Sequence, residues 1–234
     1  MGVVLVTGGS RGIGAAVARA AAGAEWTVCI TYRSDEAAAR AVGAARAVQA
    51  DVAVEADVVR AFEAACELGR LTGFVANAGI VAPKARVDEL TAERVERMLA
   101  VNVLGTIVGC REAVRRMSTR HGGGGGSIVL LGSAASRIGG SGEYVDYAAS
   151  KGAIDTLGLG LAREVADEGV RVNVVRPGLI ETEIHAPGRI ERMAPSVPAG
   201  RAGAPDEVAA AIVWLLSDAA SYTTGAVLDV SGGR

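Results

Sequence analysis

A tyrosine and a lysine in the second half of the chain have the types and the spacing of a catalytic acid and the group that tunes it. Tyr147 and Lys151 stand at the two ends of the run YAASK, so on a helix they lie about one turn apart on the same face, roughly 6 Å along the axis. A phenol has an ordinary pKa of about 10, which is too high for easy proton exchange at neutral pH. A nearby cation lowers that pKa, and the phenol still keeps enough acidity to protonate an alkoxide. The pair alone is a weak signal, because a solvated helix face produces the same spacing by chance.

The length and composition of the chain indicate a single globular domain that binds a small molecule. The 234 residues are 50% hydrophobic, with a net charge of -2 and a pI near 5.8. This length suits one α/β domain, residues 1–234, with a hydrophobic core that needs no disulfides or metals. The absence of a basic stripe in the sequence excludes nucleic acid as the expected partner and favours a small molecule.

The cysteines and the hydropathy pattern predict a cytoplasmic protein. Cys29, Cys66 and Cys110 are widely spaced in apolar or helical settings and belong to no close Cys/His cluster. We therefore expect no disulfide framework, no metal site and a reducing compartment. No apolar run approaches the roughly 20 residues of a membrane span, and no signal peptide is predicted at the start of the chain.

Short β-branched runs alternate with longer helical patterns along the whole chain. The predicted strands are Val3–Thr7, Thr27–Tyr32, Ala47–Ala50, Gly73–Asn77, Ser127–Leu131, Arg171–Val175 and Ala226–Val230. The predicted helices are Gly12–Ala22, Asp35–Val42, Val54–Leu68, Thr91–Arg120, Tyr147–Asp167 and Asp206–Ser217. This alternation predicts a single-domain, doubly wound Rossmann fold, with a seven-stranded parallel sheet, helices on both faces, and ligands at the carboxyl ends of the strands.

Two segments interrupt the alternation. The glycine run 122–126 joins a helix to a strand and is interpreted as a surface loop. The segment 183–203 contains three prolines and little apolar periodicity, and its length is typical of a lid.

The first predicted strand leads directly into the glycine-rich run TGGSRGIG, residues 7–14, and then into an alanine-rich helix. In such a loop Gly8 makes a sharp turn, Gly12 lets the backbone approach a pyrophosphate, and Gly14 permits close helix packing. The phosphates then lie at the positive end of the helix. At the first strand-to-helix turn this pattern favours dinucleotide binding over a merely structural turn.

The second predicted strand ends in the run TYRS, residues 31–34, where an NAD-binding chain often has an acid for the ribose hydroxyls. Asp35 follows too late for this role. Arg11 and Arg33 instead have the charge to flank the 2'-phosphate of NADP, with Ser10 or Ser34 donating hydrogen bonds to it. The sequence therefore predicts a preference for NADP(H), with NAD(H) as the alternative cofactor and solvated surface arginines as the alternative interpretation.

With these motifs in place, the chain resembles the short-chain dehydrogenase/reductase family over nearly its whole length, and in particular its glucose-dehydrogenase-like and ketoacyl-reductase-like members. The glycine loop is similar to that family's TGxxxGxG signature, and Asp51-Val52 resembles its pair beside the adenine ring. Asn77-Ala78-Gly79 matches the end of its NNAG segment, although Ala76 replaces the first asparagine, a departure expected to affect sheet support more than chemistry.

The resemblance also implies the remaining catalytic residues. Asn102 matches the helix-interior asparagine that in this family holds a water of the proton relay, the alternative being a core or surface amide. Ser133 follows the fifth predicted strand, fourteen residues before Tyr147, and Ser136 is its competitor. Tyr144 is a weaker rival to Tyr147, because seven residues separate it from Lys151, and we expect it to line the substrate pocket.

The run RPGLIET, residues 176–182, follows the sixth predicted strand and resembles the family's nicotinamide-binding turn. Pro177 and Gly178 are expected to shape the bend, and Ile180 and Thr182 to contact the carboxamide. The sequence prediction for the cofactor site, including the catalytic pair, is Gly8, Ser10, Arg11, Gly12, Ile13, Gly14, Tyr32, Arg33, Ser34, Asp51, Val52, Asn77, Ala78, Gly79, Tyr147, Lys151, Pro177, Gly178, Ile180 and Thr182.

These residues predict an oxidoreductase that interconverts a carbonyl and a secondary alcohol by hydride transfer without a metal. Ser133 would orient the carbonyl oxygen, Tyr147 would donate the proton, Lys151 would lower the phenol pKa and hold the ribose, and Asn102 would connect Lys151 to solvent. The alternatives are a non-catalytic NADP(H)-binding regulator, or an epimerase or dehydratase on the same scaffold.

Substrate identity and assembly are less well defined by the sequence. Substrate contacts are expected from the segment after Ile184 and from the residues before Tyr147: His185, Ile190, Met193, Ile138, Glu143 and Tyr144. The apolar content of the long helices, together with the family resemblance, predicts a homotetramer, with a homodimer as the alternative.

Overall fold

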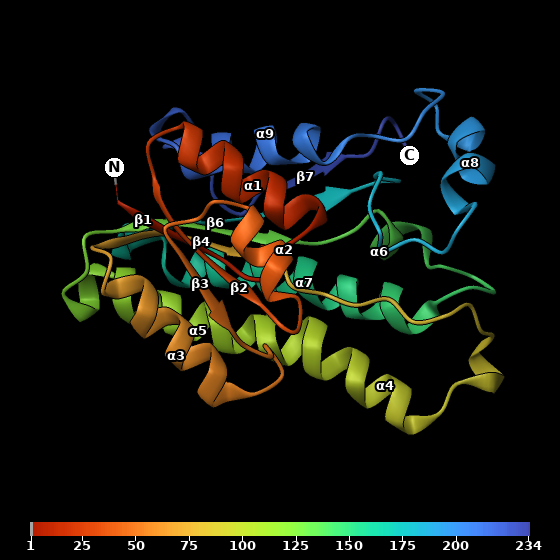
Figure 1. Cartoon of the computed structure of the whole chain (residues 1–234), viewed down its shortest axis with the longest axis horizontal. Coiled ribbons are helices and arrows are strands. Elements are labelled where there is room, and N and C mark those ends of the chain that lie inside the picture. Colours follow the sequence, from red (N-terminus) through yellow and green to blue (C-terminus); the bar gives the residue numbers. More distant parts are fainter. Residues whose placement is uncertain (1) are drawn as a thin grey trace.

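One parallel sheet forms the centre of the computed structural model, which describes residues 2–234 (Figure 1). The strands are β1 (Val3–Val6), β2 (Thr27–Tyr32), β3 (Arg46–Gln49), β4 (Leu71–Ala76), β5 (Gly126–Leu131), β6 (Val170–Pro177) and β7 (Val227–Val230). Their order is β3-β2-β1-β4-β5-β6-β7, with every neighbouring pair parallel. The predicted seven-stranded, doubly wound α/β fold is confirmed.

Helices cover both faces of the sheet (Figure 1). On one face lie α1 (Gly12–Gly23), α2 (Glu36–Ala41) and α9 (Pro205–Leu216). On the other lie α3 (Glu55–Cys66), α5 (Gly105–Met117) and α7 (Val145–Glu164). Helix α4 (Ala92–Leu99) leads into α5, while the short helices α6 (Ala135–Ile138) and α8 (Arg189–Met193) follow β5 and β6.

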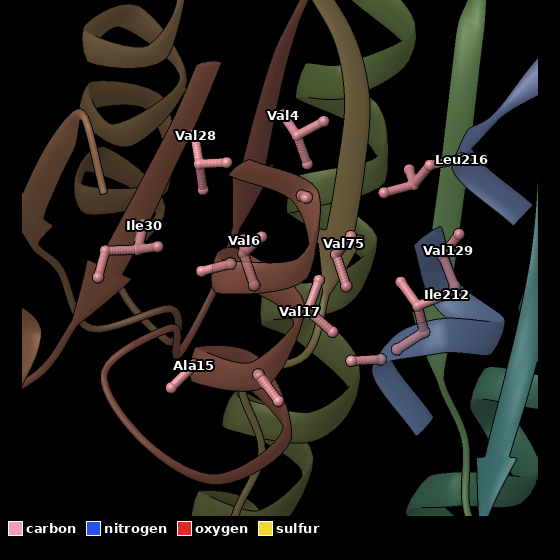
Figure 2. Packing of buried hydrophobic residues seen from close by; sticks show 14 of the residues in the cluster. Val4, Val6, Ala15, Val17, Val28, Ile30, Val75, Val129, Ile212 and Leu216 are labelled. Atoms are coloured by element: carbon pink, nitrogen blue, oxygen red, sulfur yellow. The ribbon is translucent and has the colours of Figure 1, made fainter. Parts of the chain in front are cut away.

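The sequence of β1 is apolar throughout rather than alternating, because both faces of this strand are buried. Val4 and Val6 belong to the core beneath α1 and α9, whereas Val3 and Leu5 belong to the core beneath α3, α5 and α7. Figure 2 places Val4 and Val6 among Val17 of α1 and other buried aliphatic side chains. A strand covered on both faces buries every side chain, so a continuous apolar run is the pattern expected for a central parallel strand.

The helix predicted over residues 91–120 differs in one detail that matters for the site. Helical backbone runs from Ala92 to Met117, but residues Ala100–Leu104 form a turn of π-helix between α4 and α5. This wider turn contains Asn102, and such turns occur frequently at functional sites. Nothing in the apolar periodicity distinguishes a π-turn from an α-turn, so the sequence pattern could not reveal it.

The segment predicted as a long lid loop is partly helical. It contains α8 and, directly after it, the 3-10 turn Ala194–Ser196. Three apolar side chains of these turns, Ile190, Met193 and Ala194, pack against a small buried cluster. The cluster consists of Leu179, Val197 and Ala202. The apolar residues are too few and too irregularly spaced for a helical pattern, although local packing is enough to order one turn.

The strand order reverses at β1, with β2 and β3 on one side of it and β4 to β7 on the other. At such a point the two loops that leave neighbouring strands diverge, and a crevice forms at the carboxyl ends of the strands. The loops after β1 and β4 leave from this point, and those after β5 and β6 continue along the same edge. These four loops contain most of the residues that the sequence analysis predicts for the cofactor and catalytic sites.

Candidate active site

The turn between β1 and α1 has the shape needed to hold a phosphate. Gly8 has a φ of +64° and donates its N–H to the Thr31 hydroxyl at 3.1 Å. Gly12, with a φ of +52°, opens α1, whose first turn has no acidic side chain and no side-chain cap. The first N–H groups of that helix therefore lack side-chain acceptors, as an anion-binding helix end requires.

Close packing against the loop after β4 fixes the same turn. A Cβ on Gly14 would lie 2.3 Å from the Gly8 carbonyl oxygen and 2.5 Å from Nδ2 of Asn77, so no larger residue fits there. Asn77 donates to the carbonyl oxygens of Thr7 and Gly8 at 2.8 and 3.0 Å. The Thr7 hydroxyl in turn accepts the N–H groups of Asn77 and Ala78, both at 3.1 Å. The glycine cradle is thus built to bring backbone close to a ligand, and its residues fit a dinucleotide.

The end of β2 offers positive charge and no carboxylate within the strand. Arg33 and Ser34 are exposed just beyond Tyr32, which is buried, and Arg11 is exposed at the start of α1. Asp35 is used elsewhere, because its carboxylate caps α2 by accepting the Ala38 N–H at 2.9 Å. Contact of these arginines with the adenosine ribose of a cofactor stays a prediction.

Asp51 lies beyond β3 and is held in a fixed orientation. One carboxylate oxygen accepts the Ala53 N–H at 3.0 Å, and the other accepts from Arg97 of α4 at 2.9 Å. Partial burial raises the pKa of Asp51, but these two hydrogen bonds and the charge of Arg97 outweigh it, so the net pKa is lowered. The neighbouring Val52 lines one small cavity together with Thr7 and Ala78.

Ser133, Tyr147 and Lys151 come together beyond β5, as predicted. The Ser133 hydroxyl lies close enough to the Tyr147 phenol to lower the phenol pKa, and the Lys151 ammonium lies 5.8 Å from the centre of the Tyr147 ring. Lys151 is buried and donates to the Leu131 carbonyl oxygen at 2.7 Å. A serine hydroxyl, a phenol and an ammonium group therefore share one end of the sheet.

The electrostatics of this cluster differ from the sequence expectation in one respect. Burial raises the pKa of Tyr147; the hydrogen bond from Ser133 opposes this effect, and Tyr144 adds to it. The expected lowering by Lys151 is absent because its ammonium is directed to Leu131 rather than to the phenol. Burial also lowers the pKa of Lys151 to about 8, with the charge of Asp155 opposing the shift.

Asn102 is fully buried, and protein groups occupy its side-chain amide. Its Oδ1 accepts the Ile80 N–H at 2.8 Å, and its Nδ2 donates to the Ile80 carbonyl at 3.0 Å and to the Ser150 hydroxyl at 3.0 Å. A Cβ on Gly79 would lie 3.4 Å from Asn102 Oδ1 and 3.5 Å from Lys151 Nζ. The amide therefore faces Lys151 across Gly79 and fastens the residue before Lys151 to the loop after β4.

The turn after β6 lies against the phosphate loop. Pro177 is the last residue of β6, and the Gly178 N–H bonds to the Val230 carbonyl at 3.0 Å. Ile180 forms an isolated parallel bridge with Gly203. Thr182 comes so close to α1 that a Cβ on Gly12 would lie 3.2 Å from its methyl group. Gly12, predicted to approach the pyrophosphate, and Thr182, predicted to contact the nicotinamide carboxamide, are therefore neighbours.

The two rival residues have other partners. Ser136 lies in α6, and its hydroxyl donates to the Ser133 carbonyl at 2.8 Å, which stabilises that short helix. The Tyr144 ring meets the Tyr147 ring edge-on, with centroids 5.8 Å apart, and its hydroxyl bonds to Arg189. Tyr144 thus lies beside Tyr147, and its place in a substrate pocket stays a prediction.

Arg189 of α8 is a site residue that sequence reasoning missed. Its guanidinium lies 5.1 Å from the centre of the Tyr144 ring and donates to Glu143 at 2.8 Å. Burial, together with the Arg189 charge, lowers the pKa of His185, so that this imidazole is neutral near pH 7. One arginine in a poorly patterned segment gives no sequence signal of such contacts.

Within residues 2–234, no group of three or more His, Cys, Asp and Glu side chains is arranged to hold a metal ion. None of the helices in that range is both long and apolar enough to cross a bilayer. The three cysteines are free thiols, and burial raises the pKa of Cys29 and Cys110 to about 12.

Comparison with known proteins identifies similar chains over the full length. The family model described as enoyl-(acyl carrier protein) reductase matches residues 8–234. The uncharacterized oxidoreductase YgfF of Escherichia coli is 51% identical over 247 residues, covering 100% of both chains. Among solved structures, a short-chain dehydrogenase/reductase variant of Serratia marcescens is 34% identical with a TM-score of 0.92, covering 99% of this chain and 96% of that one. A blue fluorescent protein from a metagenomic library, in complex with NADPH, is 34% identical with a TM-score of 0.91 and the same coverage.

Burial of Lys151 has a measurable consequence for stability. Its pKa falls from 10.5 to about 8 on folding, so between these values the unfolded chain binds more protons, and stability rises with pH. Below about pH 8 the lysine is charged in both states, so the full free-energy cost of burying the ammonium is present. We expect Lys151→Met to stabilise the unliganded protein at pH 7 by roughly 1–3 kcal/mol, less whatever is lost with the Leu131 hydrogen bond.

Thermal or urea unfolding of both proteins at pH 7, 9 and 10.5 would measure this difference. The advantage of Lys151→Met should shrink as pH rises. A wild-type protein that is more stable than Lys151→Met at pH 7 would show that Lys151 is not a strained, buried cation.

Proposed function

The chain belongs to the short-chain dehydrogenase/reductase family, and we propose that it transfers hydride between NADP(H) and a carbonyl compound or secondary alcohol. The observation that carries this proposal is the contact of the Ser133 hydroxyl with the Tyr147 phenol, beside the buried Lys151. Two hydroxyl groups that converge in this way give one carbonyl oxygen both an orienting donor and a proton source.

NADP(H), held by the glycine turn, by Arg11 and Arg33, and by the segment from Pro177 to Thr182, supplies the hydride when bound. The chain's own residues handle the oxygen. Ser133 donates a hydrogen bond that orients the carbonyl, and Tyr147 gives its phenolic proton to the oxygen as negative charge develops there. In the reverse direction Tyr147 takes that proton back.

Lys151 contributes charge at the bottom of the site. With a pKa of about 8 it is mostly protonated at neutral pH, and its ammonium lies 5.8 Å from the centre of the Tyr147 ring and close to Gly79. We propose that ligand binding turns the ammonium away from Leu131, and that the charge then favours the phenolate. Asn102, through Ser150 and Ile80, keeps the backbone around Lys151 in place.

The first test concerns Tyr147. Tyr147→Phe removes only the hydroxyl, so folding and NADPH affinity should be nearly unchanged, while turnover falls by at least about 100-fold, the contribution expected of a general acid. Steady-state kinetics on the best substrate from a panel of ketones, sugars, steroids and acyl thioesters would measure the loss.

Tyr144→Phe is the matched control, because it removes the neighbouring phenolic hydroxyl. We expect a change mainly in KM for this variant. Near-normal turnover by Tyr147→Phe, or a larger loss in Tyr144→Phe, would reject Tyr147 as the proton donor.

Cofactor choice is the second test. Arg11 and Arg33, with no carboxylate in β2 and with Asp35 engaged as a helix cap, favour the 2'-phosphate. NADPH should therefore bind more tightly than NADH, and Arg33→Ala should reduce the ratio by roughly 10-fold, the effect of one lost charged hydrogen bond. Nicotinamide fluorescence titrations at fixed salt would give both dissociation constants. Equal affinity for the two cofactors in the wild type, or an unchanged ratio in Arg33→Ala, would refute the assignment.

We also propose a homo-oligomer, with a tetramer favoured over a dimer, in the reducing cytoplasm that suits the three free thiols. Supporting this assembly, exposed apolar side chains lie on the helices of one face: Leu104 at the end of the π-turn, Ile107 of α5 and Leu159 of α7. Light scattering at micromolar concentration should give a mass above that of one chain, and Ile107→Asp should lower it because a buried carboxylate opposes association. A monomer in the wild type would end this proposal.

A further inference from the structure

Two arginines on α4, one turn apart, bond to acids at two different parts of the site. Arg94 bonds to Asp146, the residue immediately before Tyr147, and Arg97 bonds to Asp51 beyond β3. None of the sequence motifs includes either arginine. Their positions suggest that α4 supports the site from outside rather than contacting a ligand.

The contact of Arg94 with Asp146 is bidentate and largely hidden from water. Nε donates to one carboxylate oxygen at 2.7 Å and an Nη donates to the other at 3.3 Å. The Arg94 side chain is 17% exposed and that of Asp146 only 2%. A fork-to-fork pair with so little solvent fixes orientation as well as charge, which a single-point lysine contact does not.

Asp146 is part of the helix turn that aims Tyr147. The first turn of α7 leaves backbone N–H groups without helical partners, and Tyr144 at the cap position supplies no side-chain acceptor. The Asp146 carboxylate lies close enough to the backbone N–H groups of Tyr147 and of Asp146 itself for them to lower its pKa. The carboxylate that Arg94 holds therefore belongs to the residue directly before the proposed proton donor, in the first turn of the same helix.

Arg94 has a third contact that completes this junction. Its other Nη donates to the Pro83 carbonyl oxygen at 2.7 Å, in the loop after β4. The same loop is fastened by Asn102 at Ile80 and reaches the Glu143 carbonyl through the Ala85 N–H at 2.9 Å. One guanidinium thus joins α4, the loop after β4 and the start of α7.

Arg97 has a different partner and a more open setting. Its guanidinium donates to Asp51 at 2.9 Å, and the two side chains are 42% and 27% exposed. Because the Arg97 guanidinium bonds to Asp51 and not to Asp146, its effect should be confined to the cofactor end of the site. The two arginines form a natural pair for comparison on one helix.

We propose that Arg94 is a positioning residue for Tyr147, acting through Asp146, and that Arg97 is the corresponding positioning residue for Asp51. The first half of this proposal rests on the proposed function, because it assumes that Tyr147 is the proton donor. A displacement of about 1 Å in a reacting group is enough to cost roughly 100-fold in rate. Loss of Arg94 should accordingly lower kcat, and loss of Arg97 should weaken NADPH binding.

The experiment compares Arg94→Met, Arg94→Lys, Asp146→Asn and Arg97→Met with the wild type. Arg94→Met should lower kcat at least about 10-fold and leave the NADPH dissociation constant within about 2-fold, since Tyr147 is displaced but the glycine turn is intact. Arg94→Lys should recover only part of kcat, and Asp146→Asn, which keeps an acceptor but loses the charge, should resemble it. Arg97→Met should raise the NADPH dissociation constant several-fold and lower kcat less than Arg94→Met does. Arg86→Met, which removes the exposed pair with Asp88, is the neutral control.

A spectroscopic readout separates positioning from loss of the fold and does not need a substrate. With tyrosines labelled with ¹³C at Cζ, the four signals include one that Tyr147→Phe assigns and one from the fully exposed Tyr222. Arg94→Met should shift or broaden the Tyr147 signal and change its titration, while the Tyr222 signal stays unchanged. An unchanged Tyr147 signal, or a loss of kcat that merely follows the loss of folded protein in a melting curve, would overturn the proposal. If the wild type reduced no compound of the panel, the proposed function would fail, whereas the Tyr147 signal and the NADPH titrations would still decide whether the arginines position these residues.

Discussion

The contact between the β1–α1 turn and the loop after β4 is the constraint on which the rest of the site depends. At Gly14 there is no room for a side chain against Gly8 and Asn77. The Asn77 side chain also donates to the carbonyl oxygens of Thr7 and Gly8, which fastens the two loops together. Because β1 and β4 are neighbours at the reversal of strand order, this contact sets the width of the crevice. The same loop then reaches Asn102 and Arg94, so this contact also links the glycine turn to the start of α7 through Asp146.

A buried cation next to a buried phenol is an expensive arrangement, and the surrounding charges suggest how it is tolerated. Lys151 donates to one carbonyl and lies one helical turn before Asp155, whose charge supports the ammonium form. Asp155 is itself held by both ends of the Arg176 guanidinium, at 3.1 and 2.9 Å. Breaking a buried pair by removing one partner leaves an uncompensated charge, so this arginine holds the Asp155 carboxylate in place. Burial of the Lys151 ammonium therefore lowers the stability of the unliganded protein, in exchange for a charge that the proposed function needs. Such a trade-off between stability and function is common.

The sequence was sufficient for the parts of the molecule that local chemistry determines. All seven strands and their parallel arrangement followed from apolar runs that alternate with helical patterns, and Gly14 and Asn77 lie where the glycine motif and the family resemblance required. Ser133 and Tyr147 meet although fourteen residues separate them, because one follows a strand and the other lies on the next long helix. The direction of the Lys151 ammonium was not predictable, since it depends on the Leu131 carbonyl of another element. The π-turn at Asn102, the helix α8 and the roles of Arg94 and Arg189 are likewise products of tertiary contacts, which leave no periodic or motif signal.

The wall of the proposed substrate site illustrates why specificity is harder to infer than chemistry. The Tyr144 ring touches Tyr147 from one side and is held from the other by Arg189, which also bonds to Glu143. The wall thus combines a turn before α7 with a helix from the segment between β6 and α9, and neither is shaped by a conformational rule as strict as that of a glycine turn. A change in α8 would move Tyr144 without disturbing Ser133 or Lys151, because their positions come from β5 and α7. The chemistry of the site and its choice of substrate can therefore vary separately, and the second depends on contacts that only the folded chain brings together.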